Sequence, residues 1–269
     1  MSGFTRGLGV IWNIAATTVG EAIRRRVLLI ILLIGLVLLS IIPSLSILSA
    51  RSSTSITIGT MYAVMQGTSV ILAIILTVYM IPNEIERRTI YTILSKPVQR
   101  WQFFVGKYLG AVLSLALMIA LMSVVMIGLF WMFQKPPIDK IIEVAQQPVL
   151  YWMEMSLLAA VAIFLSTFVA PLINFFLSIG IWVVGTVLNP LYDSISKNTN
   201  APPIMQALAK LITSMLPNFE NYDVKNPIIN PGQNIQNQSS YYIYVMVYGV
   251  IYILILLLIG GVIFDRREV

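Results

Sequence analysis

The feature that most constrains this chain is a short charged segment between two long runs that carry no charge. Residues 84–107 read E-I-E-R-R-T-I-Y-T-I-L-S-K-P-V-Q-R-W-Q-F-F-V-G-K. Residues 52–83 before this segment and 108–134 after it contain no Asp, Glu, Lys or Arg. Uncharged apolar runs of this length are typical of membrane-spanning helices. The charged segment is therefore predicted to be a loop that lies in water between two spans.

The composition of the whole chain agrees with a membrane protein. Hydrophobic residues make up 58% of it and charged residues only 10%, and its mean hydropathy is +0.87. Soluble domains carry about 25% charged residues. The absence of His and Cys excludes a histidine base, a thiolate metal site and a cysteine nucleophile. The Gly106-Lys107 pair lacks the rest of a phosphate-binding loop, so we expect no catalytic, metal-binding or cofactor-binding residue in this chain.

The apolar runs predict an all-α polytopic membrane protein with six transmembrane helices. About 20 apolar residues in a helix cross a hydrocarbon core of about 30 Å. The apolar run at 149–192 is too long for one span and is split at Pro171, which breaks the helical hydrogen bonding, while Asn174 tolerates a turn. The predicted spans are residues 27–48, 56–81, 108–133, 149–170, 171–192 and 241–264.

The charge distribution orients these spans. With both termini on one side, that side holds eleven basic and five acidic residues, and the other side holds six of each. The positive-inside rule then places the basic side, with both termini, in the cytosol. Membrane insertion explains the net charge of +6, so we expect no nucleic-acid partner. The predicted location is a bacterial plasma (inner) membrane, where the lipid bilayer surrounds the spans.

Residues 1–26 show the spacing of an amphipathic helix. Apolar side chains recur at intervals of three and four residues from Leu8 to Ile23. The pattern predicts a helix that lies in the plane of the membrane interface. The residues expected at this interface are Trp12, Arg24, Arg25, Arg26 and, at the entry to the third span, Trp101.

The charged loop contains the signals of a short helix over residues 83–100. Asn83 and Glu86 have the spacing of a capping box. Lys96 before Pro97 indicates that the short helix ends near Leu94 or Ser95 and that the next helix begins at Pro97. Apolar residues among the charges favour burial against a partner protein, with packing on the lipid surface as the alternative. The residues expected to take part are Glu84, Glu86, Arg87, Arg88, Ile90, Ile93, Leu94, Lys96, Pro97 and Arg100.

This loop, continued by Y-L-G, resembles the signature loop of the ABC-2 type transporter permeases, in the branch similar to the multicopper-enzyme-maturation permeases. E-A-I-R-R-R before the first span, L-S-T-F-V-A-P-L-I-N at the 149–192 hairpin and the terminal F-D-R-R-E-V fit as well. The resemblance implies the permease subunit of an ABC exporter. Two permease copies, as a homodimer, would form the pathway. Two copies of a cytosolic ABC ATPase, which bind ATP and Mg, would drive it through a coupling helix at residues 83–100.

Two other classes of function remain open from the residues alone. An ion-coupled secondary transporter would need an ionisable residue deep in a span. The only acid in a predicted span is Glu154, which is expected near the outer end and hence at the interface. A non-transporting membrane anchor or assembly factor also fits the charged loop, and only the resemblance separates it from a permease.

The substrate is not identified by the sequence. Gln66, Asn174 and Asn189 are candidates to line the pathway, but each is equally suited to hydrogen bonding between helices. A conduit so poor in charge favours a hydrophobic or amphipathic cargo. Residues 193–240 form the largest predicted extracytoplasmic element, which would be a spacer, an outer gate or a docking platform for an extracytoplasmic partner.

Overall fold

The computed structural model describes residues 2–48, 54–86, 99–197, 202, 204, 207, 211, 216–224 and 238–266. Every regular element within these ranges is a helix, in agreement with the all-α prediction. In chain order they are α1 (Ser2–Arg24), α2 (Arg26–Leu48), α3 (Thr54–Val78), α4 (Met80–Glu86), α6 (Arg100–Gln134), α7 (Ile138–Ser166), α8 (Pro171–Lys197), the 3-10 helix η1 (Glu220–Tyr222) and α10 (Gln238–Arg266).

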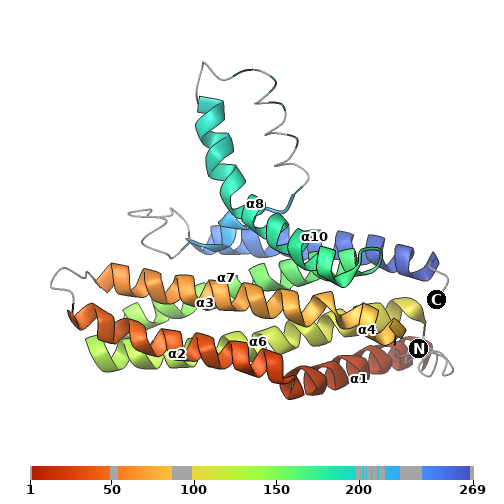
Figure 1. The fold of residues 1–269 in the computed structure, drawn as a ribbon, viewed down its shortest axis with the longest axis horizontal. Helices are drawn as coiled ribbons and strands as arrows, with labels where there is room; N and C mark the ends of the chain where they lie inside the picture. The colour runs from red at the N-terminus through yellow and green to blue at the C-terminus, as the bar shows by residue number, and fades with distance from the viewer. Residues whose placement is uncertain are drawn as a thin grey trace.

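The long helices α2, α3, α6, α7 and α10 run along the long axis of the molecule (Figure 1). The helices α3 and α7 lie at the centre, because 72% of the apolar stretch of α3 and 83% of that of α7 are buried. The corresponding share is only 22% for α10. The outer helices therefore present apolar surface outward, as helices that meet lipid acyl chains do.

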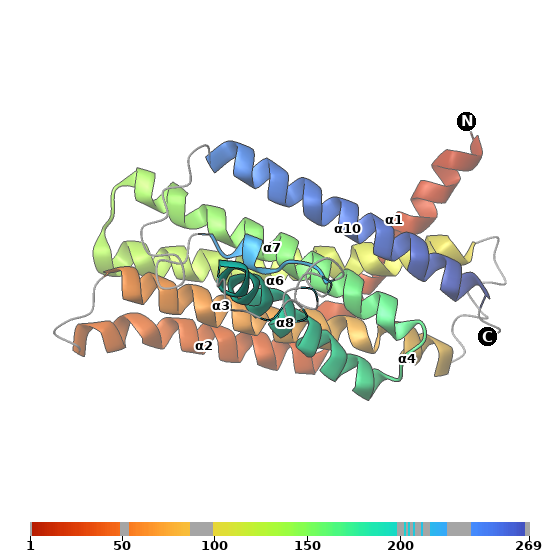
Figure 2. The ribbon, with the colours of Figure 1, turned by 90° about the horizontal axis from the view of Figure 1, so that it is seen from above.

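Five helical stretches among the described residues are long and apolar enough to cross a membrane: Arg26–Ser44, Thr54–Glu84, Arg100–Gln134, Ile138–Ser166 and Ser240–Asp265. They make the chain a multi-pass membrane protein. The remaining predicted span, 171–192, differs, because the apolar part of α8 is shorter and covers Pro171–Val187. This helix crosses the bundle obliquely, and its C-terminal part points away from the other helices (Figures 1 and 2).

The predicted break between the fourth and fifth spans is confirmed at Pro171. The helix α7 ends at Ser166 and α8 begins at Pro171, where the missing N–H of proline leaves no helical hydrogen bond unmade. Asn174 does not form the turn that the sequence suggested. It lies in the first turn of α8, and its Nδ2 donates to the carbonyl oxygen of Ala162 in α7 at 2.9 Å. The two helices are thus tied together just beyond the turn.

The helices α3 and α4 are separated by a single residue, Tyr79. Pro82 has no N–H to donate to the carbonyl of Val78, which accounts for the interruption. The backbone N–H of Asn83 donates to the carbonyl oxygen of Tyr79 at 3.2 Å, so Asn83 lies inside α4. The predicted capping box with Asn83 as its N-cap is therefore wrong. Glu84 consequently stands in the second turn of α4 rather than the first.

At its other end, the predicted coupling segment runs into α6. This helix begins at Arg100 with Gln99 as its extended N-cap (φ −78°, ψ 146°). The N–H of Gln99 donates to Oε1 of Gln102 at 3.1 Å, which fixes the first turn. The prediction that Pro97 begins this helix is wrong, because the non-helical Gln99 precedes Arg100. Residues 87–98 themselves lie outside the described part of the chain.

Candidate functional site

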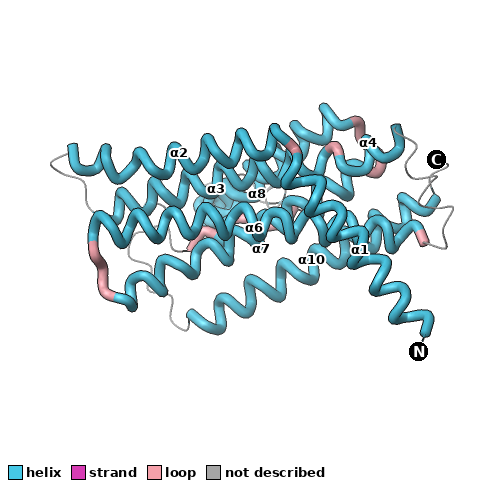
Figure 3. Tube along the Cα trace, turned by 90° about the horizontal axis from the view of Figure 1, so that it is seen from below, coloured by secondary structure: helices cyan, strands magenta, loops and turns pink. Residues whose placement is uncertain are grey.

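A buried lysine, Lys107 of α6, joins the helices α1, α4 and α6. Figure 3 shows α1 and α4 at the same end of the molecule. Lys107, in the second turn of α6, has only 4% of its surface exposed. Its Nζ donates to Oε1 of Glu84 in α4 at 2.7 Å and to Oε2 of Glu21 in α1 at 3.3 Å. The ring of Phe103 lies with its centroid 5.8 Å from the same Nζ. One ammonium group therefore connects α1, α4 and α6.

The two ion pairs differ in strength because they differ in exposure. The Glu84 side chain is 16% exposed, whereas that of Glu21 is 52% exposed. An exposed pair contributes at most about 1 kcal/mol, because water and salt screen it. Breaking a buried pair is far more damaging, since the charge that remains is left without compensation. The Lys107–Glu84 pair is therefore the contact that fixes α4 to α6.

The helix α1 comes this close because α6 offers it a surface of small residues. Gly106 and Gly110 are four residues apart, the spacing that lets helix backbones approach in membranes. A Cβ atom at Gly106 would lie 2.9 Å from the side chain of Ile14, and one at Gly110 only 2.4 Å from Cβ of Thr18. The buried face of α1 consists of Ile11, Ala15, Thr18 and Ala22. Part of the predicted apolar stripe of α1 thus packs on protein.

Of the residues predicted to contact the ATPase, the structure describes the side chains at the two ends of segment 83–100, Glu84 and Arg100. Glu84 pairs with Lys107 inside the chain, and its part in a contact with the ATPase stays a prediction. Nη1 of Arg100 donates to the carbonyl oxygen of Asp265 in α10 at 3.4 Å. The side chain of Glu86 lies outside the described part of the chain, as do Arg87, Arg88, Ile90, Ile93, Leu94, Lys96 and Pro97.

The residues predicted at the membrane interface are mostly exposed. Trp12 has 64% and Trp101 has 48% of its surface exposed. Arg24 and Arg26 are exposed, and Arg25 is half-buried. The helix α1 is inclined to the long axis of the bundle (Figure 2). Exposure of this kind suits an interfacial anchor, and the assignment stays a prediction.

A second polar cluster lies inside the bundle, around Glu154. This side chain is fully buried. Nε2 of Gln66 in α3 donates to both of its carboxylate oxygens at 3.1 Å, and Nε1 of Trp182 in α8 donates to Oε1 at 2.8 Å. The expectation that Glu154 is interfacial is wrong. Because α7 already begins at Ile138, Glu154 stands about four turns into the helix rather than one.

A second buried acid, Asp223, lies near this cluster. Tyr151, one turn before Glu154 on α7, donates its hydroxyl to Oδ1 of Asp223 at 2.9 Å. Nε2 of Gln147 donates to the carbonyl oxygen of Tyr222 at 2.7 Å. Burial raises the pKa of Tyr222 well above its ordinary value, so its hydroxyl stays protonated and donates to the carbonyl of α10 residue Val245 at 3.4 Å. Segment 216–224 is thus tied to α7 and α10.

The polar residues predicted to line a pathway are engaged between helices instead, as far as the structure describes them. Gln66 joins α3 to α7 through Glu154. Asn174 joins α8 to α7, and its Oδ1 accepts from the hydroxyl of Ser178 at 3.0 Å. Hydrogen bonding between helices, the alternative that the sequence left open, accounts for both side chains. The side chain of Asn189 lies outside the described part of the chain.

A family model described as "ABC-2 family transporter protein" matches residues 12–269. The chain belongs to the ABC-2 transporter family. A comparison with curated proteins finds no match. The family assignment confirms the resemblance seen in the charged loop and covers nearly the whole chain. This ABC-2 protein is therefore the membrane component of an ABC transporter, it is not itself the ATPase, and its family implies an ATPase partner.

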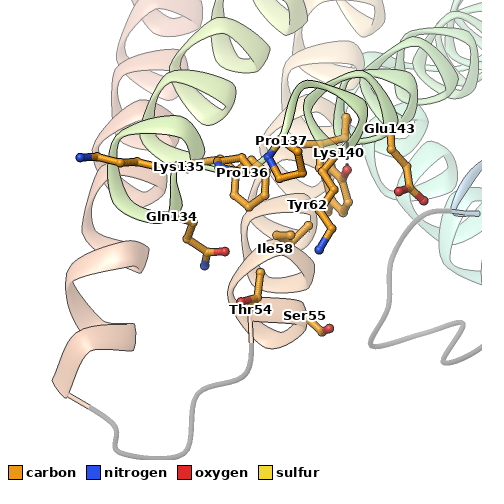
Figure 4. Close-up of a pocket in the computed structure, with 12 residues that line it drawn as sticks. Thr54, Ser55, Ile58, Tyr62, Gln134, Lys135, Pro136, Pro137, Lys140 and Glu143 are labelled. Atoms are coloured by element: carbon orange, nitrogen blue, oxygen red, sulfur yellow. Dashed lines mark hydrogen bonds between the residues drawn. The ribbon is translucent and has the colours of Figure 1, made fainter.

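The ABC-2 protein also has an open vestibule at the end of α6 that is opposite Lys107. Figure 4 shows the residues that line it. Its volume is about 510 Å³, and it lies between the start of α3, the end of α6 and the start of α7. Lys135 closes α6 in the left-handed conformation at φ 43° and helps to line the vestibule. Tyr62 also lines it, donates its hydroxyl to the carbonyl of Val144 at 3.0 Å and meets the edge of Tyr151 at 6.2 Å between ring centroids. The vestibule thus ends on α7, which carries Glu154, and on α3, whose Gln66 donates to Glu154.

Sequence reasoning missed the buried charges of this ABC-2 protein. From the sequence, Lys107 is only part of an incomplete phosphate-binding loop and one of the eleven basic residues on the cytosolic side, although Gly106 and Gly110 on either side of it signal a close helix contact. Glu154 was assigned to the interface because the helix was expected to begin near residue 149. No grouping of three or more acidic side chains that could hold a metal ion occurs in the part of the chain that the structure describes.

Proposed function

We propose that this chain is the permease subunit of an ABC exporter, driven by separate cytosolic ATPase chains through residues 83–100. The observation that supports this coupling is the Lys107 cluster. The segment begins inside α4, where Glu84 binds Lys107, and it ends at Arg100, the first residue of α6. Both ends are therefore fixed to the bundle. A force applied to the segment reaches α1 and α6 through short, mostly buried contacts.

In this proposal ATP and Mg bind to the partner, and the contribution of this chain is mechanical. Movement of α4 pulls on Glu84, which shares the Lys107 ammonium with Glu21 of α1. Because Gly106 and Gly110 hold α1 against α6 at close range, α1 and α6 respond together. The same movement reaches α3, since only Tyr79 separates α3 from α4. Two copies of this chain and two ATPase chains form the working unit.

The direction of transport is inferred from the charged loop, and the class of cargo from the polar residues of the spans. Export rests on the resemblance of the charged loop and its flanking motifs to exporter permeases. A hydrophobic or amphipathic cargo is favoured because the described polar candidates for the pathway, Gln66 and Asn174, are both occupied by contacts between helices. The charge bias places both termini in the cytosol of a bacterial plasma membrane. Residues 193–240 then lie outside, as a spacer, a gate or a docking platform.

Glu154 is the one observation that favours ion coupling as a second candidate. A carboxylate buried deep in a span is typical of proton-coupled and cation-coupled transporters. Three hydrogen bonds to it, from Gln66 and Trp182, provide a structural explanation instead. The variant Glu154→Gln separates the two: activity retained with ATP indicates a structural carboxylate, whereas transport that follows an ion gradient without ATP and is lost in this variant supports ion coupling.

The coupling proposal is tested by charge reversal within the segment. In Arg88→Glu, an acid replaces a base that we expect at the ATPase contact. An uncompensated charge at such an interface costs about 2–5 kcal/mol of binding free energy. The variant should therefore insert normally but copurify poorly with the ATPase, or hydrolyse ATP without transport. The matched control is Lys140→Glu, an exposed lysine of the outer vestibule. Equal behaviour of the two variants would show residues 83–100 to be an ordinary solvated loop.

A further inference from the structure

A wide groove lies between the start of α6 and the end of α10. It has a volume of about 950 Å³ and is lined mostly by apolar side chains of these two helices. Leu254 and Leu258 in its wall are 53% and 69% exposed, so the groove opens sideways, away from the bundle. A Cβ atom placed on Gly261, another wall residue, would meet no atom within 4 Å. The groove is therefore unfilled by the chain's own described side chains.

The polar groups of the groove gather at one end. Arg100 begins α6 and Asp265 stands near the end of α10, and Nη1 of Arg100 donates to the carbonyl oxygen of Asp265 at 3.4 Å. Gln99 lies beside them. Leu254 is eleven residues before Asp265, which is about 16 Å along the helix axis. One end of the groove thus carries a cation and an anion, and the remainder is apolar.

We propose that this groove binds a phospholipid with a zwitterionic headgroup, which carries a phosphate and an ammonium group, drawn from the cytosolic leaflet. The Arg100 guanidinium faces the phosphate, which guanidinium groups bind with directed hydrogen bonds. The Asp265 carboxylate faces the ammonium group. An acyl chain lies along Leu258 and Leu254 and covers Gly261. An anionic headgroup without an ammonium would place its charge beside the Asp265 carboxylate, whereas a zwitterion matches both charges.

The position of the groove in the membrane supports this occupant. Arg100 and Asp265 lie at the end of the bundle that the basic residues assign to the cytosol. Trp101, which is 48% exposed and lines the same groove, is the type of side chain that prefers the headgroup layer. Polar groups at headgroup depth and apolar walls toward the membrane centre are the arrangement that a phospholipid has. The proposal does not depend on the direction of transport or on the ATPase.

The test uses photoactivatable phospholipids. The purified full chain is placed in lipid nanodiscs that contain a small fraction of a probe with a photoactivatable acyl chain and an ethanolamine, choline or glycerol headgroup. Mass spectrometry then locates the labelled residues. We expect labelling along Leu254–Val262 and Trp101–Val105, about fivefold stronger for the ethanolamine probe than for the glycerol probe, the factor that one exposed ion pair provides.

Two variants and one control variant make the test specific. Gly261→Trp should fill the groove and abolish this labelling, while Gly128→Trp, at a glycine of α6 that also has open space around it, should leave it unchanged. Asp265→Asn should remove the preference for the ethanolamine probe over the glycerol probe and keep the labelling itself. Size-exclusion and thermal unfolding profiles establish that all three variants are folded.

Three results would overturn the proposal. The first is equal labelling of the groove by all three probes, and the second is labelling that persists in Gly261→Trp. The third comes from Leu258→Cys in native membranes, where cysteine is otherwise absent from the chain. Efficient disulfide formation between two copies of this variant would show that a second copy of the chain, and not a lipid, covers the groove.

Discussion

Replacement of Lys107 by methionine should destabilise the protein, because it breaks the buried ion pair with Glu84. The substitution keeps the length of the side chain and removes the ammonium that Glu84 and Glu21 share. Breaking a buried ion pair costs about 3–5 kcal/mol. Because Glu84 is 16% exposed and water partly solvates the carboxylate left behind, we expect a loss near the lower limit, about 3 kcal/mol.

The loss is measurable as a fall in the midpoint of thermal unfolding. For chains of about this size, 1 kcal/mol shifts the midpoint by about 2–4 °C, so Lys107→Met should unfold roughly 6–12 °C below the parent. The double variant Lys107→Met with Glu84→Gln leaves no buried charge uncompensated, since the remaining carboxylate of Glu21 is 52% exposed, and it should recover most of this loss. The matched control Lys140→Met removes an exposed ammonium and should change the midpoint little.

One pattern would refute the reasoning. If Lys107→Met unfolds at the same temperature as Lys140→Met, then the buried pair does not hold α4 to α6. If the double variant is as unstable as the single one, the effect comes from lost packing on Phe103 and not from the charge on Glu84. In either case the mechanical link between residues 83–100 and the bundle would lose its physical basis.

Glu154→Ala should lower the unfolding midpoint more than Glu154→Gln, because the alanine leaves buried donors unpaired, at about 1–3 kcal/mol each; equal midpoints would contradict the hydrogen-bonded cluster. Gly110→Ala should destabilise by about 1–3 kcal/mol through overpacking, whereas Gly128→Ala should not, and the same comparison by thermal unfolding checks the close packing of α1. For topology, an impermeant thiol reagent on intact cells should label Ile138→Cys, while Thr92→Cys should be labelled only after permeabilisation. Labelling of the Thr92 variant from outside would invert the proposed orientation.

The sequence predicts the broad architecture of this protein well, since length, hydropathy and charge dictate it directly. A helix is the only way for a long uncharged segment to satisfy its backbone in lipid, apart from a closed barrel. The break at Pro171 follows equally from local chemistry, because proline cannot continue the helical hydrogen bonding. These arguments depend on neighbours in the sequence and need no knowledge of the packing.

The sites were harder to predict, because they depend on which helices meet. Lys107 is buried only because Glu84 and Glu21 arrive from two other helices, and nothing near Lys107 in the sequence shows that they do. Glu154 is buried only because Gln66 and Trp182 reach it from α3 and α8. Helix boundaries failed for a related reason: polar turns extend a helix beyond its apolar stretch, so α7 begins at Ile138 rather than 149.

The central claim, that residues 83–100 receive force from an ABC ATPase, is tested most directly by site-specific crosslinking. A photocrosslinking amino acid replaces Thr92 in the segment and, in a matched control, Lys140 on the outer face. After irradiation of intact cells, mass spectrometry identifies the crosslinked partner. The account predicts that Thr92 yields an adduct with an ATPase chain that carries a phosphate-binding loop, and that Lys140 yields none. Suppose that the ATPase copurifies with the protein from the same cells. Adducts of Thr92 with lipid alone would then contradict the account.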